Sequence, residues 1–105
     1  MALVVLSLFE VRAQYNKSYF FWMGREHIIE SRYREAIRSL NVLLNVDREA
    51  YEGYLLRGIA KYNLEDLLGA DADFSRAIDI NPVYTMAYQY RAITRARLGN
   101  YEDAL

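Results

Sequence analysis

Apolar residues in the middle of the chain recur at intervals of three and four. Between residues 51 and 64 they are Tyr54, Leu55, Gly58, Ile59, Tyr62 and Leu64. Because an α-helix turns once every 3.6 residues or so (about 100° per residue), these positions share one broad face. Glu65 and Asp66 interrupt the pattern, and a second apolar stripe follows at Ala70, Phe74, Ala77 and Ile78. The pattern predicts two helices joined by a short turn, with Asp66 as the N-cap of the second.

The same arrangement returns along the chain at an interval of 34 residues. A forward shift aligns Tyr54 with Tyr88, Arg57 with Arg91, Ile59 with Ile93, Leu64 with Leu98 and Ala70 with Ala104. A backward shift aligns Gly58 with Gly24, Ala70 with Ala36 and Phe74 with Leu40. A fixed period of this length is typical of stacked helical hairpins. We expect an all-α stack of antiparallel helix pairs, with a divergent first repeat over 17–50, a second over 51–84 and a truncated third over 85–105.

Small residues in register indicate where paired helices approach each other. Gly58 in mid-helix costs about 1 kcal/mol relative to alanine, a cost that is tolerated where a neighbouring helix must come close. We expect Ala70 to lie across from Gly58, and Gly24 and Ala92 to hold the equivalent places in the flanking repeats.

Polar residues predict where each repeat ends. Asn81 followed by Pro82 is expected to cap and begin the next helix, and Asp47 is expected to cap one repeat earlier. In the third repeat, Gly99–Asn100 predicts a turn. The preceding helix, Thr85 to Arg97, would then have an uncovered apolar face.

Composition narrows the class of protein. The 105 residues are 53% hydrophobic and carry a net charge of -1, which supports a folded core and argues against disorder. Interspersed acids and bases give no general attraction to nucleic acid or anionic lipid. The lack of cysteine excludes disulfides and thiolate metal sites.

The first residues differ from the rest of the chain. Residues from Ala2 to Phe9 are almost all apolar, and the small residues that end at Ala13 suit cleavage by signal peptidase. Against this interpretation, no basic residue precedes the apolar run and Glu10 follows it directly. We predict a signal-like segment over 1–16, and hence a protein exported to the periplasm or cell surface of a bacterium. Alternatively this segment is a short helix or strand that caps the first repeat, and the protein is cytoplasmic. The run is too short to span a membrane.

Candidate catalytic chemistry is sparse. His27, the one histidine, has Glu30 one turn away, but a zinc site needs three or four ligands, so a core or half-buried packing imidazole is expected. The carboxylates Asp71, Asp73 and Asp79 fall at helical spacings and are interpreted as a solvated face rather than an acid–base pair. We therefore expect no enzymatic activity, metal or cofactor.

Two arginine clusters lie near tyrosines, a combination that can stack nucleic-acid bases. They comprise Arg32, Arg34 and Arg38, and Arg91, Arg95 and Arg97. Neighbouring acids, such as Glu35 and Glu102, cancel their field. Nucleic acid is therefore not expected as a partner.

Residues Lys17 to Leu105 resemble the tetratricopeptide repeat (TPR) family, most closely over 51–84. The residues that fall on the family's consensus places there are Gly58, Ala70, Phe74, Ala77 and Pro82. The chain departs from the pattern at Arg57, where a leucine is usual, and at Lys61, where a tyrosine is usual. The resemblance implies a right-handed superhelical stack, an α-solenoid, whose concave groove binds peptides or protein surfaces.

The resemblance also implies which residues line the groove. They are Phe21, Arg25 and Ile28 in the first repeat, Glu52, Leu55, Ile59, Tyr62 and Asn63 in the second, and Met86, Gln89, Tyr90, Ile93 and Arg97 in the third. This aromatic and aliphatic lining favours an apolar or amphipathic segment as ligand. Alternatively, Leu55, Ile59 and Ile93 pack against each other and against further helices.

One known use of this groove is not expected here. Some family members clamp the carboxylate terminus of heat-shock chaperones with lysines and asparagines. Here those places hold Phe21, Arg25, Leu56, Met86 and Tyr90, so the clamp is absent.

The sequence therefore predicts a non-enzymatic scaffold that binds a protein or peptide partner and forms the N-terminal part of a longer repeat protein. An alternative is the targeting or regulatory region of a larger exported enzyme, such as a peptidase or sensor kinase, which a catalytic motif past Leu105 would reveal. A further expectation is a homo-oligomer formed through the exposed face of the third repeat.

Overall fold

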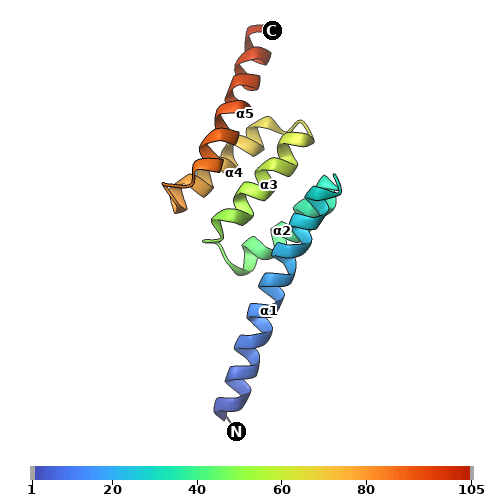
Figure 1. The fold of residues 1–105 in the computed structure, drawn as a ribbon, viewed down its shortest axis with the longest axis vertical. Helices are drawn as coiled ribbons and strands as arrows, with labels where there is room; N and C mark the ends of the chain where they lie inside the picture. The colour runs from blue at the N-terminus through green and yellow to red at the C-terminus, as the bar shows by residue number, and fades with distance from the viewer. Residues whose placement is uncertain (1, 105) are drawn as a thin grey trace.

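A computed structural model describes the backbone of residues 2–104 and the side chains of residues 16–100. The described backbone forms five α-helices: α1 (Ala2–Ile29), α2 (Tyr33–Val46), α3 (Tyr51–Asn63), α4 (Leu67–Ile80) and α5 (Thr85–Ala104). Each helix packs against the next along the chain, and paired helices run antiparallel (Figure 1). The resulting stack is elongated, measuring 65 × 28 × 18 Å. The predicted all-α stack of helix pairs is confirmed.

The helix boundaries repeat the interval seen in the sequence. Both the starts and the ends of α2 and α4 differ by 34 residues, as do the ends of α1 and α3 and the starts of α3 and α5. The turns inside the two hairpins use Ser31 and Glu65, with φ of 60° and 68°, and these residues share the same spacing. Sequence period and structural period therefore coincide through the start of α5.

Polar residues at the helix ends act partly as predicted. The Asp66 carboxylate caps α4 and accepts a hydrogen bond of 3.0 Å from the backbone N–H three residues ahead. Asp47 and Asn81 instead follow α2 and α4, and each side-chain oxygen accepts from the backbone N–H two residues ahead, at 3.0 and 3.4 Å. Such local turns compete with helix capping. The prediction that Asp47 and Asn81 cap the following helices, and that Pro82 begins one, is therefore wrong, because α3 and α5 start at Tyr51 and Thr85.

The core consists of two apolar clusters. The first joins α3 and α4 to α2 and α5 and contains Leu44, Tyr54, Leu55, Ala70, Phe74, Ala77, Ile78 and Ala87. The second lies between α1, α2 and α3 and contains Ala36, Leu40, Leu43 and Ala60. Each cluster is built across a helix pair and its neighbour, so the hairpins are joined into one stack.

Glycine makes room for a large side chain at equivalent places in two repeats. A Cβ added to Gly58 would lie 2.5 Å from the ring of Phe74, and one added to Gly24 would lie 2.5 Å from the side chain of Leu40. The sequence predicts Ala70 across from Gly58, whereas the atoms nearest to Gly58 belong to Phe74. Ala70 is fully buried in the same cluster.

A buried ion pair joins α3 to α4. Asp73 is only 4% exposed, so the predicted solvated face is wrong at this position. Arg57 donates from Nε and Nη2 to the two carboxylate oxygens of Asp73, at 2.8 Å each, and the Lys61 Nζ lies 3.1 Å from Oδ2. The hydrogen bond to Asp73 raises the pKa of Arg57. The two departures from the family pattern, Arg57 and Lys61, thus share one buried carboxylate.

The third repeat departs from its prediction. The helix α5 continues through Gly99 and Asn100, so the expected turn is not formed. Ala92, which is in register with the buried Gly24 and Gly58, is exposed.

The first helix is longer than its repeat. Because α1 begins at Ala2, the backbone of residues 2–16 of the signal-like segment is part of that helix rather than a strand. The side chains of residues 1–15 lie outside the described part, and the export interpretation stays a prediction. Among the described residues, no helix combines the length and apolar character required to cross a bilayer.

Candidate functional site

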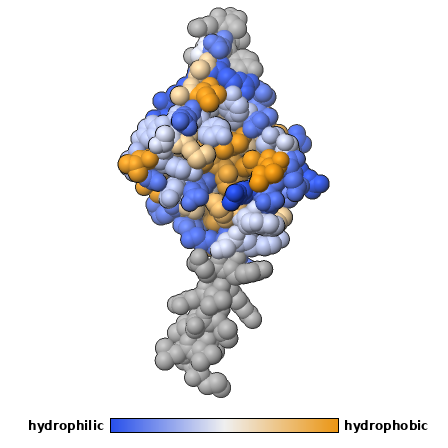
Figure 2. All heavy atoms as spheres, in the orientation of Figure 1, coloured by the Kyte–Doolittle hydropathy of each residue, from blue (hydrophilic) through white to orange (hydrophobic). Residues whose placement is uncertain are grey.

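The first helices of the repeats, α1, α3 and α5, form the inner side of the stack. Contacts join α1 to α3 and α3 to α5, whereas α2 and α4 have no Cα atoms within 8 Å of each other in the described chain. The inner helices therefore lie closer together than α2 and α4 do, and the side formed by α1, α3 and α5 is called the concave side below. Figure 2 shows apolar side chains, in orange, gathered in the middle of one face among hydrophilic ones.

On α1, the three predicted site residues differ in environment. Phe21 is half-buried and lines a hollow between α1 and α3. Arg25 is exposed, and Ile28 is half-buried against the second core cluster. Phe21 and Arg25 therefore remain open to a partner.

On α3, part of the predicted set belongs to the core. Leu55 is 3% exposed within the first cluster, so its prediction as a partner-binding residue is corrected to a packing role. Ile59 and Tyr62 are half-buried against that cluster. Glu52 is exposed at the hollow. Asn63 is exposed, and its side-chain amide donates a hydrogen bond of 2.8 Å to the backbone carbonyl of Ile59.

On α5, apolar side chains face solvent. Met86 is 47% and Ile93 is 50% exposed, and Gln89 is also exposed. Tyr90 is half-buried because its ring stacks on Phe74, with centroids 5.7 Å apart. Of the two expectations for Ile93, exposure on the surface is the one found.

The predicted arginine of α5 is engaged within the protein. The guanidinium carbon of Arg97 lies 4.9 Å from the centre of the Tyr62 ring, and Arg97 forms an ion pair with Glu65. This pairing ties the third repeat to the turn of the second and reduces the charge that Arg97 offers to a ligand.

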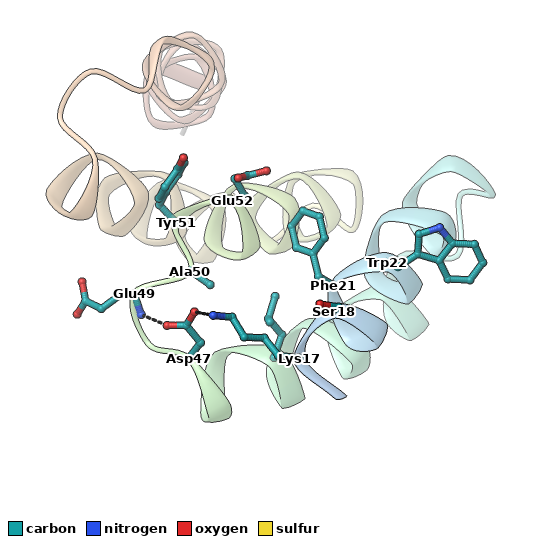
Figure 3. A pocket seen from close by; sticks show the side chains of 10 residues that line it. Lys17, Ser18, Phe21, Trp22, Asp47, Glu49, Ala50, Tyr51 and Glu52 are labelled. Atoms are coloured by element: carbon teal, nitrogen blue, oxygen red, sulfur yellow. Dashed lines mark hydrogen bonds and ion pairs between the residues drawn. The ribbon is translucent and has the colours of Figure 1, made fainter. Parts of the chain in front are cut away.

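The hollow between α1 and α3 has a volume of about 580 Å³. It is lined by Lys17, Ser18, Phe21, Trp22, Leu43, Asp47, Glu49, Ala50, Tyr51 and Glu52. Figure 3 shows Phe21 projecting from α1 toward α3, and Trp22 pointing away from the other lining side chains. Opposite them, Lys17 pairs with Asp47, and the hydrogen bond from Lys17 holds the pKa of Asp47 below its usual value.

Eight of the ten lining residues were missed by the sequence analysis, which identified only Phe21 and Glu52. The hollow is formed where α1 faces the connection between α2 and α3, so its residues do not follow one helical face. Trp22, the one tryptophan of the chain, is a signal that could have directed attention to this place.

Candidate metal ligands do not gather among the described residues. No group of three or more histidine, cysteine, aspartate or glutamate side chains within them could hold a metal ion. His27 is half-buried as expected, and its Nδ1 is buried without a hydrogen-bond partner. Most of the predicted site residues are partly or fully exposed.

Comparison with solved structures identifies the fold as that of TPR domains, which confirms the predicted resemblance. The TPR2B domain of yeast Sti1, solved in complex with pHsp70, matches with a TM-score of 0.78 and 24% identity, covering 85% of this chain and 71% of that one. The TPR2AB domain of yeast Sti1, solved in complex with pHSP90, matches with a TM-score of 0.78 and 22% identity, covering 93% of this chain and 40% of that one. This chain thus spans less than half the length of the second structure. No protein-family model and no curated protein sequence matches it.

Proposed function

We propose that this chain is a protein-interaction module that holds a peptide or protein segment on its concave side. The observation that carries the proposal is the apolar surface left open there. Met86 and Ile93 are about half exposed, and Phe21 lines a hollow of about 580 Å³. Clustered apolar surface of this kind is typical of sites that bind other molecules, and the volume lies within the range of ligand sites.

The solved structures support a binding role because both were determined as complexes, with pHsp70 and pHSP90. These ligands belong to those proteins. In this chain the places that hold lysine and asparagine in carboxylate-clamping family members include Met86 and Leu56, so a different ligand is proposed, one that offers apolar side chains.

A phage-displayed library of random peptides selected on the intact chain tests the proposal. The double variant Met86→Ser/Ile93→Ser replaces exposed apolar groups on α5, and we expect it to weaken binding of the selected peptides at least several-fold. The matched control, Val42→Ser/Val46→Ser, removes side chains of α2 that are 39% and 56% exposed on the outer side. The control should bind as the parent does. Peptides that lose binding to the α2 variant alone would contradict a concave site.

A second candidate, self-association, is favoured by the same exposed face of α5. On this face, Met86 is 47% and Ile93 is 50% exposed. Light scattering over a range of concentrations tests it: a rising mass that Met86→Ser/Ile93→Ser suppresses would support it, and a constant monomer mass would refute it. A role as the targeting or regulatory region of a larger exported enzyme stays a proposal, and a catalytic motif past Leu105 would support it.

A further inference from the structure

The hollow between α1 and α3 is apolar inside and acidic at its edge. Phe21, Leu43 and Ala50 contribute apolar surface. Three carboxylates, those of Asp47, Glu49 and Glu52, and one cation, Lys17, also line it. These four side chains carry a net charge of -2, whereas the whole chain carries only -1. Negative charge is therefore concentrated at this place.

Two of the carboxylates are available to a ligand. Asp47 is neutralised by its ion pair with Lys17. Glu49 and Glu52 are exposed, and within residues 16–100 the side chain of neither makes a hydrogen bond or ion pair. Arg48 lies in the same connection but does not line the hollow. The uncompensated negative charge of the lining thus belongs to Glu49 and Glu52.

The field of Glu52 is felt by a neighbouring residue. Tyr84 contacts the ring of Tyr51 edge-on, with centroids 5.0 Å apart. Burial raises the pKa of Tyr84, and the negative charge of Glu52 raises it further. A cation close to Glu52 would be stabilised by the same charge.

We propose, building on the proposed function, that the segment captured here is basic and amphipathic. A large apolar side chain of the ligand enters the hollow beside Phe21, and a neighbouring lysine or arginine reaches Glu49 or Glu52. Exposed ion pairs contribute little affinity each, so the apolar anchor supplies most of the binding and the carboxylates select the charge of the partner. An acidic segment would place like charges together.

Labelled synthetic peptides provide the test. The first has a central phenylalanine flanked by lysines, and the second is its twin with glutamates in place of the lysines. A third keeps the lysines and replaces phenylalanine with glycine. Binding of each to the intact chain is measured by fluorescence anisotropy at low and at high salt. We expect the first peptide to bind more tightly than both others, and its affinity to fall as salt rises.

Two variants that lose the same charge distinguish an effect of the hollow on peptide affinity from an effect of the net charge of the protein. Glu49→Gln/Glu52→Gln should weaken the basic peptide about two- to thirtyfold, the range for losing two exposed ion pairs. The control Glu35→Gln/Asp79→Asn removes the same charge from exposed positions on α2 and α4, and it should change the affinity by less than about twofold. Equal weakening by both variants would overturn the inference, because net charge would then explain the effect.

The remaining outcomes distinguish this inference from the proposed function. If the acidic twin binds as well as the basic peptide, and Met86→Ser/Ile93→Ser weakens both, the concave site stands and its charge selectivity is refuted. If the basic peptide binds but only Val42→Ser/Val46→Ser weakens it, both proposals fail. If no synthetic peptide binds while library peptides bind the concave side, the inference alone is overturned.

Discussion

Replacing Gly58 with alanine tests the packing that joins the helices of the second repeat. The new Cβ would lie 2.5, 2.8 and 3.0 Å from three ring atoms of Phe74. That ring is fully buried and stacks on Tyr90, so it has little room to move. Overpacking of this kind costs about 1–3 kcal/mol, while the better helix propensity of alanine returns about 1 kcal/mol. We expect Gly58→Ala to be neutral to about 2 kcal/mol less stable than the parent.

A matched control isolates the packing effect. Gly99 is also helical, but a Cβ there would meet nothing within 4 Å. Gly99→Ala should therefore gain up to about 1 kcal/mol from propensity alone, which leaves the two alanine variants about 1–3 kcal/mol apart. Urea unfolding followed by circular dichroism gives both values.

A double-mutant cycle tests whether Phe74 is the side chain that the new Cβ at position 58 would contact. Phe74→Leu alone is destabilising because it shortens a buried side chain, but it also removes the ring that the new Cβ would meet. We expect Gly58→Ala to cost at least about 1 kcal/mol less in the Phe74→Leu background. Additive effects, or equal stabilisation by Gly58→Ala and Gly99→Ala, would refute the proposed contact.

Two further predictions concern ion pairs. Asp73→Ala should destabilise the fold by about 3 kcal/mol, the lower end for a broken buried pair, because Arg57 and Lys61 lose their shared carboxylate. Arg57 keeps its hydrogen bond to Asn41. Thermal unfolding measures the loss of stability, and a value below about 1 kcal/mol would contradict the buried pairing. Lys17→Met should raise the pKa of Asp47 toward its usual value, as followed by NMR titration. The folded-state pKa of Asp47 is lowered, so its contribution to stability is present above the unfolded-state pKa and is lost as the pH falls through the folded-state pKa. The Lys17→Met variant should lack this contribution when it is unfolded by acid. An unchanged pKa of Asp47 in the variant would contradict the pairing with Lys17.

The helices and their stacking could be predicted because both follow from local information. Apolar spacing fixes one face of each helix, and glycine at Gly24 and Gly58 recurs at the same interval as Leu40 and Phe74. Hairpin partners are close in sequence, so the period itself indicates which helices meet.

The ion pair between Arg57 and Asp73 could not be predicted from helical spacing alone. The two residues are 16 positions apart on different helices, and the periodicity of α4 says nothing about which cation faces it across the hairpin. The signal was present in the two basic departures from the family pattern, Arg57 and Lys61, which lie one turn apart on α3. Two cationic side chains on the side of a helix that faces the core are stabilised there only if an anionic side chain lies nearby.

The candidate site was predicted only in part for a related reason. Family spacing places both Leu55 and Ile93 on the inner side, yet Leu55 is packed in the first core cluster and Ile93 is half exposed. Which of them is covered depends on the neighbouring helices, and the spacing along one helix does not contain that information. The hollow is formed by α1 and the connection before α3, and a connection has no period from which its residues could be inferred.

The most direct test of a binding site on the concave side uses a library-selected peptide that carries a nitroxide spin label. Bound peptide broadens the NMR signals of amides near the label. We expect broadening on α1, α3 and α5, around Phe21, Ile59 and Ile93, and unchanged signals on α2 and α4. Broadening centred on α2 and α4, around Val46 or Leu68, would contradict it.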